Sequence, residues 1–194
     1  IGESMASSRN FKLEFFGKTA HATLPHSGKD ALAAAVECYA NIQTMITRTV
    51  NPFAKYVCSV GKLSAGTTQN VIADYALMLG TLRTFDMSTD KKIINSIERI
   101  ANRAAENFGC TAKLTTDLKA FVVYNDPEIS RLVIRSAEAV VGKENIAQMP
   151  IKMSSEDFSQ YLTKKPGVFF RLGTRNEKKG ITSLPHNNDF LIDE

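Results

Sequence analysis

The order of hydrophobic periods in the first 120 residues most restricts how this chain can fold. Some segments alternate apolar and polar side chains, as half-buried strands do, and others repeat apolar side chains at helical spacing. In chain order they are a strand at residues 10–17, a helix at 30–48, strands at 56–63 and 71–85, a helix capped by Ser88 and stopped by Gly109, and a strand at 111–118. This succession predicts an α+β fold with a split βαβ arrangement.

A split βαβ arrangement, as in ferredoxin-like domains, is a four-stranded antiparallel sheet with both helices on one face. We expect it at residues 10–119, with residues 1–9 as a connector. Later signals predict a helix opened by Asp126 and Pro127 and ended by Gly142, a helix from Ser154 or Ser155 to before Lys165, and a buried strand at 168–172. These elements are too few to enclose a core, so residues 120–194 are expected to be an incomplete α/β part of another domain.

The composition argues against several classes of function. The net charge is +4 over 194 residues, and the basic side chains are scattered rather than clustered, so a nucleic-acid surface is not expected. The sequence contains no apolar stretch of membrane-spanning length and no signal-like start, so we expect a cytoplasmic protein without a membrane partner. Cys38, Cys58 and Cys110 are widely spaced in apolar surroundings, which is typical of reduced core residues.

The loop after the first strand places His21 and His26 five positions apart, ahead of the first helix. Loops between strands and helices often carry functional groups on a rigid scaffold, and imidazole titrates near neutral pH. The two histidines therefore suggest a site. The alternative is that His21 only ends the strand and that His26 belongs to a turn.

Short motifs are spread over nearly the whole chain. They are Met5-Ala6-Ser7-Ser8, the loop from Gly17 to His26, Asn70-Val71-Ile72, Gly80-Thr81-Leu82-Arg83, Ser155-Glu156-Asp157-Phe158, Pro166-Gly167-Val168-Phe169-Phe170 and Pro185-His186-Asn187. In their order and spacing, the chain resembles the C-terminal portion of M20-type metal-dependent amidohydrolases and peptidases, the group of hippurate hydrolases and N-acyl-amino-acid deacylases. The resemblance implies that residues 10–119 are a lid or dimerisation domain inserted into a larger zinc-peptidase-like catalytic domain.

The resemblance also implies roles for single residues. His21 matches a lid histidine that reaches the catalytic centre of a partner subunit and polarises the scissile carbonyl. Asn70 and Arg83 match positions that hold the carboxylate of the substrate, and a guanidinium fork suits that planar group. His186 matches a histidine that binds one of two metal ions. Without the resemblance, Arg83 would be a surface ion-pair residue, Asn70 a turn residue and His186 an ordinary loop residue.

In the resembled family, the other metal ligands and the glutamate base come from an N-terminal region that this sequence does not contain. The intact enzyme is expected to hold two divalent ions, zinc or manganese. We expect this chain alone to bind no metal and to be inactive, either as a piece of a longer protein or as a truncated product, because one histidine does not make a metal site. Glu156 and Asp157 are expected to be structural.

The hypothesis from the sequence is that the intact protein hydrolyses the amide of N-acyl amino acids, related small amides or short peptides with a metal-activated water. This chain would supply the lid, the substrate anchors and one ligand, and its sheet edge predicts a homodimer through the lid domain. The competing hypothesis is a non-catalytic ferredoxin-like dimerisation module that binds a small carboxylate. That module would keep Arg83 and Asn70 but would give His21 no catalytic role.

Overall fold

The computed structural model describes residues 1–193, so Glu194, the end of the expected second part, lies outside the described residues. The helices and strands are β1 (Gly2–Met5), β2 (Ser8–Phe16), α1 (Ala31–Thr49), β3 (Tyr56–Ala65), β4 (Tyr75–Thr84), α2 (Met87–Asn107), β5 (Thr111–Ala120), β6 (Val123–Asn125), α3 (Pro127–Val141) and α4 (Ser159–Leu162). Short 3₁₀ turns are η1 (Pro25–Ser27), η2 (Lys143–Asn145) and η3 (Glu177–Lys179). We call residues 8–120 the sheet unit and residues 121–193 the C-terminal region.

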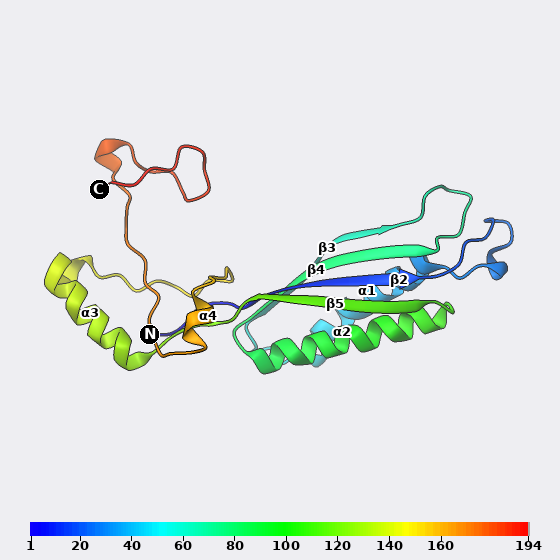
Figure 1. Ribbon diagram of the computed structural model, residues 1–194, viewed down its shortest axis with the longest axis horizontal. Helices are drawn as coiled ribbons and strands as arrows, with labels where there is room; N and C mark the ends of the chain where they lie inside the picture. The colour runs from blue at the N-terminus through cyan, green and yellow to red at the C-terminus, as the bar shows by residue number, and fades with distance from the viewer. Residues whose placement is uncertain (194) are drawn as a thin grey trace.

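The sheet unit has the predicted architecture. Its four strands are antiparallel in the order β3-β4-β2-β5, and α1 and α2 lie side by side on one face of the sheet, as Figure 1 shows. At one end, which we call the tip, Phe16 pairs with Tyr75 and Thr111. At the opposite end, the base, Ser8 pairs with Ala120, and the chain continues from there into the C-terminal region.

Alternation along the strands builds the core of the sheet unit. Phe11, Leu13 and Phe15 of β2 point to the helices and are almost fully buried. They share one apolar cluster with side chains from β4 and from both helices, including Met78, Leu82, Ile42, Ile93 and Ile97. Gly80 of β4 belongs to this packing, because a Cβ atom there would lie 2.1 Å from the ring of Phe11. The aromatic ring therefore fills the space that the glycine leaves.

The limits of several elements differ from the sequence prediction. Asp86, not Ser88, caps α2, since its carboxylate accepts hydrogen bonds from the backbone N–H groups of Ser88 and Thr89. The Ser88 hydroxyl donates to the same carboxylate at 2.7 Å. The strand expected from Val71 begins only at Tyr75, because the residues before it turn toward the loop of His21 instead of continuing along β2.

The C-terminal region corrects two further predictions. The helix expected from Ser154 or Ser155 is the single turn α4, which begins at Ser159. The preceding segment is held extended, because Ala6 N–H contacts the carbonyls of Lys152 and Ser154, both at 3.1 Å. The sequence prediction also missed β1 and β6. These strands are only four and three residues long, and they pair with each other although they lie far apart in the sequence.

The strand expected at residues 168–172 does not form among the described residues. The side chain of Asn125 holds this segment instead, accepting from Phe169 N–H at 2.8 Å and donating to the Phe169 carbonyl at 3.0 Å. Phe170 and Leu172 are 67% and 78% exposed. The segment has the apolar side chains of a buried strand, but no described strand pairs with it.

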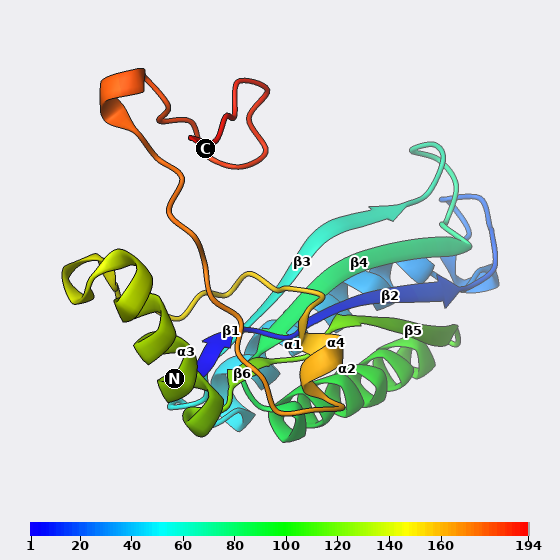
Figure 2. The same cartoon turned by 60° about the vertical axis from the view of Figure 1, so that its left-hand side comes forward.

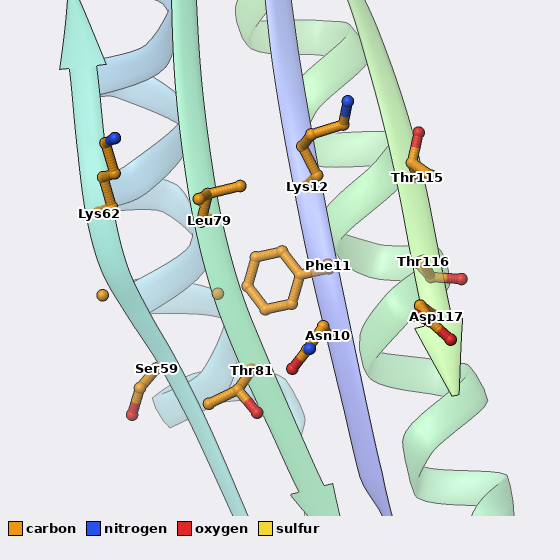
Figure 3. A pocket seen from close by; sticks show the side chains of 12 residues that line it. Asn10, Phe11, Lys12, Ser59, Lys62, Leu79, Thr81, Thr115, Thr116 and Asp117 are labelled. Atoms are coloured by element: carbon orange, nitrogen blue, oxygen red, sulfur yellow. The ribbon is translucent and has the colours of Figure 1, made fainter. Parts of the chain in front are cut away.

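The face of the sheet opposite the helices is open. Figure 3 shows side chains from all four strands around a shallow hollow of about 450 Å³ in this face. Its lining includes Lys12, Lys62, Leu79, Thr81 and Thr115. None of the predicted site residues lines it.

Candidate functional site

His21 lies in the loop between β2 and α1, beyond the tip of the sheet, and is exposed. It forms an isolated antiparallel bridge with Val71. Its Nδ1 atom lies 2.8 Å from the hydroxyl oxygen of Thr23 and accepts from Thr23 N–H at 3.3 Å. Because Nδ1 accepts a hydrogen bond, the pattern assigns the proton of the neutral ring to Nε2. Nε2 is thus available as a hydrogen-bond donor to a group outside the loop.

The backbone of this loop is fastened on both sides. Lys18 and Lys29 form an antiparallel bridge where the two ends of the loop meet, with N···O distances of 3.0 and 2.9 Å. Ile72 N–H donates to the Ala20 carbonyl at 2.8 Å, directly before His21. The imidazole therefore projects from a braced loop rather than from a free one.

Asn70 lies beside His21 at the tip. Ala22 N–H donates to the Asn70 carbonyl at 3.0 Å, which joins the two predicted site residues through one backbone contact. The Asn70 side chain is exposed, and its Oδ1 accepts from the Thr68 hydroxyl at 3.3 Å. The structure thus brings His21 and Asn70 together at one end of the sheet unit.

Arg83 lies at the opposite end. It is the penultimate residue of β4 and is half-buried, and it points to the open face because its neighbours Leu82 and Thr84 point to the helices. Eight residue steps separate Tyr75 at the tip from Arg83, which at strand spacing is about 27 Å. Within one chain, Arg83 therefore cannot contact the same small substrate as His21.

The side chain of Arg83 meets the C-terminal region. Its Nη1 atom donates to the hydroxyl oxygen of Ser155 at 2.9 Å, across 72 positions of sequence. Among the described residues, no other hydrogen bond or ion pair involves this guanidinium. Sequence reasoning identified the motif of Ser155 but not this contact, because Ser155 was expected to cap a helix.

His186 lies in the segment that extends away from the sheet unit, drawn in red in Figure 2. It is exposed. Among the described residues, it is the one non-glycine residue whose φ is positive, at 75°. A hydrogen bond of 2.6 Å from the Ser183 hydroxyl to Asp189 closes the turn around it. A second set of hydrogen bonds joins the two ends of this loop, where Lys179 and Asn176 donate to Asp193. These contacts hold the pKa of the Asp193 carboxyl below its usual range.

The described residues do not form a metal site on their own. Over residues 1–193, no group of three or more His, Cys, Asp or Glu side chains is arranged to hold an ion. Within the part of the chain that the structure describes, neither Glu156 nor Asp157 makes a side-chain hydrogen bond or ion pair. Their backbone carbonyls accept from Ser159 and Gln160 in the turn ahead of α4. No helix among the described residues has both the length and the apolar character needed to cross a membrane.

The cysteines are free thiols in apolar surroundings, as predicted. Burial raises the pKa of Cys38 to about 12, with a further contribution from the charge of Glu37. Burial also raises the pKa of Cys58 to about 11. Since the thiolate is the reactive form, these values disfavour nucleophilic roles for both residues at neutral pH.

Comparisons with known proteins identify the family of this chain. A family profile described as a peptidase dimerisation domain matches residues 6–109. The chain is 31% identical over 195 residues to thermostable carboxypeptidase 2 of Saccharolobus solfataricus, covering 100% of this chain and 49% of that protein. It is 34% identical over 172 residues to an N-acetyldiaminopimelate deacetylase of a Geobacillus species, covering 89% and 46%.

A solved structure agrees as well. The Bacillus subtilis YXEP protein, a dinuclear metal-binding peptidase of the M20 family, superposes with a TM-score of 0.73 at 28% identity. The match covers 99% of this chain and 46% of that one. The chain thus belongs to the M20 family of peptidases and amidohydrolases and contains its dimerisation domain. It spans about half the length of the curated relatives it matches.

Proposed function

We propose that the protein to which this chain belongs hydrolyses the amide bond of N-acyl amino acids or short peptides with a metal-activated water. The observation that carries the proposal is His21, an exposed imidazole on a braced loop with Nε2 as its donor atom, in a domain of this family. A donor aimed at the developing oxyanion lowers the barrier to amide hydrolysis. The named relatives include a carboxypeptidase and a deacetylase, both of which act on such bonds.

His186 is the residue of this chain that we propose as a metal ligand, to zinc or manganese, in a site of two ions. The described residues supply no further ligands around it, so activation of the water depends on groups that they do not provide. We therefore assign this chain the donor to the carbonyl, the carboxylate anchors and one ligand. The cytoplasmic location remains a prediction from the sequence.

The separation of His21 and Arg83 favours a site shared between two chains. Two sheet units that pair edge to edge around a twofold axis run in opposite directions, so the tip of one lies beside the base of the other. His21 and Asn70 of one chain would then reach the substrate whose carboxylate is held by Arg83 of its partner. A homodimer is therefore required by the proposed chemistry as well as favoured by the domain type.

One edge of the sheet is better suited to this pairing than the other. The outer strand β5 carries Lys113, Asp117 and Lys119, whereas Lys62 is the one charged residue in β3. Charged side chains discourage strand pairing at an edge, which favours β3.

Helix α1 adds an apolar surface beside β3. Leu32, Val36 and Tyr39 are 42%, 52% and 42% exposed and follow one stripe of the helix. The stripe faces away from α2, because the residues of α1 that meet α2 lie on the opposite flank, where Glu37 accepts from Asn107 at 2.8 Å. We propose that β3 and this stripe together form the dimer interface.

A charge in the stripe tests the interface. Val36→Glu places a carboxylate in the proposed contact, so we expect a shift from dimer to monomer, measured by sedimentation or light scattering. Asn102→Glu is the matched control, since it adds the same charge at an exposed position of α2. If both variants remain dimeric, the dimer forms elsewhere.

Turnover of N-acetyl amino acids by the full-length protein tests the chemistry. His21→Ala removes the proposed donor, so we expect kcat to fall about 100-fold or more. His26→Ala, in η1 of the same loop, should leave kcat near that of the unmodified protein. Turnover that survives His21→Ala would mean that His21 has no catalytic role, as expected if residues 10–119 serve only as a dimerisation module that binds a carboxylate.

A further inference from the structure

The hydrogen bond between Arg83 and Ser155 joins the two parts of the molecule. Arg83 lies near the end of β4, at the base of the sheet unit. Ser155 lies in the C-terminal region just ahead of α4. Ser155 is the first residue of the motif Ser155-Glu156-Asp157-Phe158. It neither caps a helix nor forms a hydrogen bond with any other described side chain. Both residues of this contact are half-buried.

The backbone around Ser155 is firmly placed. Lys152 N–H donates to the Ser4 carbonyl at 3.0 Å, and Ala6 N–H donates to the carbonyls of both Lys152 and Ser154, each at 3.1 Å. The chain then enters the sheet unit through Ser7, whose N–H donates to the Thr84 carbonyl at 2.8 Å. Ser155 and Arg83 are thus attached to the same short stretch of hydrogen-bonded backbone.

The atom that Ser155 binds determines what Arg83 can still do. Ser155 takes Nη1, so the edge formed by Nε and Nη2 has no partner among the described residues. That edge carries two parallel N–H groups, which is the geometry that binds a carboxylate in bidentate fashion. A guanidinium fixed at one end also loses less side-chain entropy when the carboxylate arrives.

We propose that Ser155 is a positioning residue that holds Arg83 by Nη1 and presents its Nε and Nη2 edge to the carboxylate of the substrate. This inference rests on the proposed function of Arg83 and adds the residue that orients it. The C-terminal region thereby sets the carboxylate specificity of a side chain that belongs to the sheet unit.

Steady-state kinetics of the full-length enzyme test the proposal. Loss of one hydrogen bond to a charged group in Ser155→Ala should raise KM for an N-acetyl amino acid by about tenfold. We expect kcat to stay within about twofold, because the scissile amide lies away from the carboxylate. Ser155→Thr keeps the hydroxyl and should restore KM, and Ser154→Ala, an exposed neighbour, is the matched control.

A double-mutant cycle separates positioning from direct contact. If Ser155 acts only through Arg83, Ser155→Ala should have no further effect on KM in the Arg83→Ala background. The same substrate with its carboxylate converted to a carboxamide should respond weakly to either substitution. Additive effects of the two substitutions would overturn the positioning role.

The remaining outcomes distinguish this proposal from the function on which it rests. An unchanged KM in Ser155→Ala together with a raised KM in Arg83→Ala would overturn the role of Ser155 alone. An unchanged KM in Arg83→Ala would overturn the carboxylate site itself. Relaxation of the Arg83 Nε–H signal in NMR spectra should show faster motion in Ser155→Ala and not in Ser154→Ala, and equal motion in both would also overturn the proposal.

Discussion

The sheet unit and the C-terminal region of this chain differ in how they bury apolar side chains. In the sheet unit, two helices and four strands close over one cluster that includes Phe15, Leu13 and Ile97. In the C-terminal region, Val123 is the one buried apolar residue among those described, and Leu132 and Val140 of α3 are 63% and 84% exposed. The first part is folded by its own side chains, and the second has apolar surfaces that its own elements do not cover.

Under the proposed function, this difference separates the roles of the two parts. Backbone hydrogen bonds of the sheet unit hold His21 and Asn70 at its tip, far from its base. The C-terminal region would contribute single groups, such as Ser155 and His186, from segments with little core of their own. Substitutions in the two parts should therefore have unequal effects on folding.

The largest contrast is expected for two phenylalanines. Phe15→Ala opens a cavity in a fully buried position and should lower the free energy of unfolding by about 3–5 kcal/mol. Phe170→Ala removes the same atoms from a side chain that is 67% exposed, so a change below about 0.5 kcal/mol is expected. Denaturant titration followed by circular dichroism measures both, and equal losses would contradict the contrast.

Two acidic residues give the next largest contrast. Asp90 is buried and binds Arg9 through both oxygens, with Nε distances of 2.9 and 3.1 Å. Asp90→Ala leaves that guanidinium largely buried without a counter-charge, and we expect a loss of about 3 kcal/mol.

The control for Asp90 is an exposed pair in the other part of the chain. Glu177 pairs with Arg175, and their side chains are 75% and 64% exposed. Glu177→Ala should therefore change stability by less than about 0.5 kcal/mol. The same denaturant titration measures it, and a loss as large as that of Asp90→Ala would show that the C-terminal region is part of one cooperative core.

The smallest contrast concerns helix caps. Asp86 caps α2 and Asp126 caps α3, each accepting two backbone N–H groups. Asp86→Ala should lower the free energy of unfolding by about 1 kcal/mol, whereas Asp126→Ala should only fray α3 and leave the main transition in place. Amide exchange resolved by residue would show whether α3 indeed opens separately.

The cap of α2 also predicts an acid effect. Hydrogen bonds from the Thr89 and Ser88 side chains and backbones hold the pKa of Asp86 well below the ordinary value of 3.8. Because the folded pKa is the lower one, the stabilisation is present above pH 3.8 and is lost as the pH falls below it. Asp86→Asn should flatten this part of the pH dependence, and an unchanged slope would contradict it.

The sequence was sufficient for the sheet unit because alternation in β2 and helical spacing in α1 and α2 are local signals. It was less informative where structure depends on distant partners. Phe170 and Leu172 look like a buried strand, but burial requires neighbouring strands that no local pattern reveals. Ser155 looked like a cap, and its contact with Arg83 spans 72 positions.

The motifs point to candidate residues but not to their geometry, and the roles of these residues stay predictions. The motifs named His21, Asn70 and Arg83 without showing that they divide between two ends of the sheet. The antiparallel order could have shown it, since β2 ends at the tip and its neighbour β4 ends at the base. The tautomer of His21 depends on Thr23, a local signal two residues away that the sequence analysis did not use.

Mixing two impaired variants of the full-length protein, assayed at a substrate concentration well below KM, tests the shared site most directly. His21→Ala and Arg83→Ala disable different ends of the sheet unit, so a hybrid dimer keeps one site with both groups intact. Random exchange of subunits should then restore about a quarter of the unmodified activity, since half the dimers are hybrids with one working site each. If the mixture is no more active than the separate variants while subunits demonstrably exchange, the two residues do not meet across a dimer.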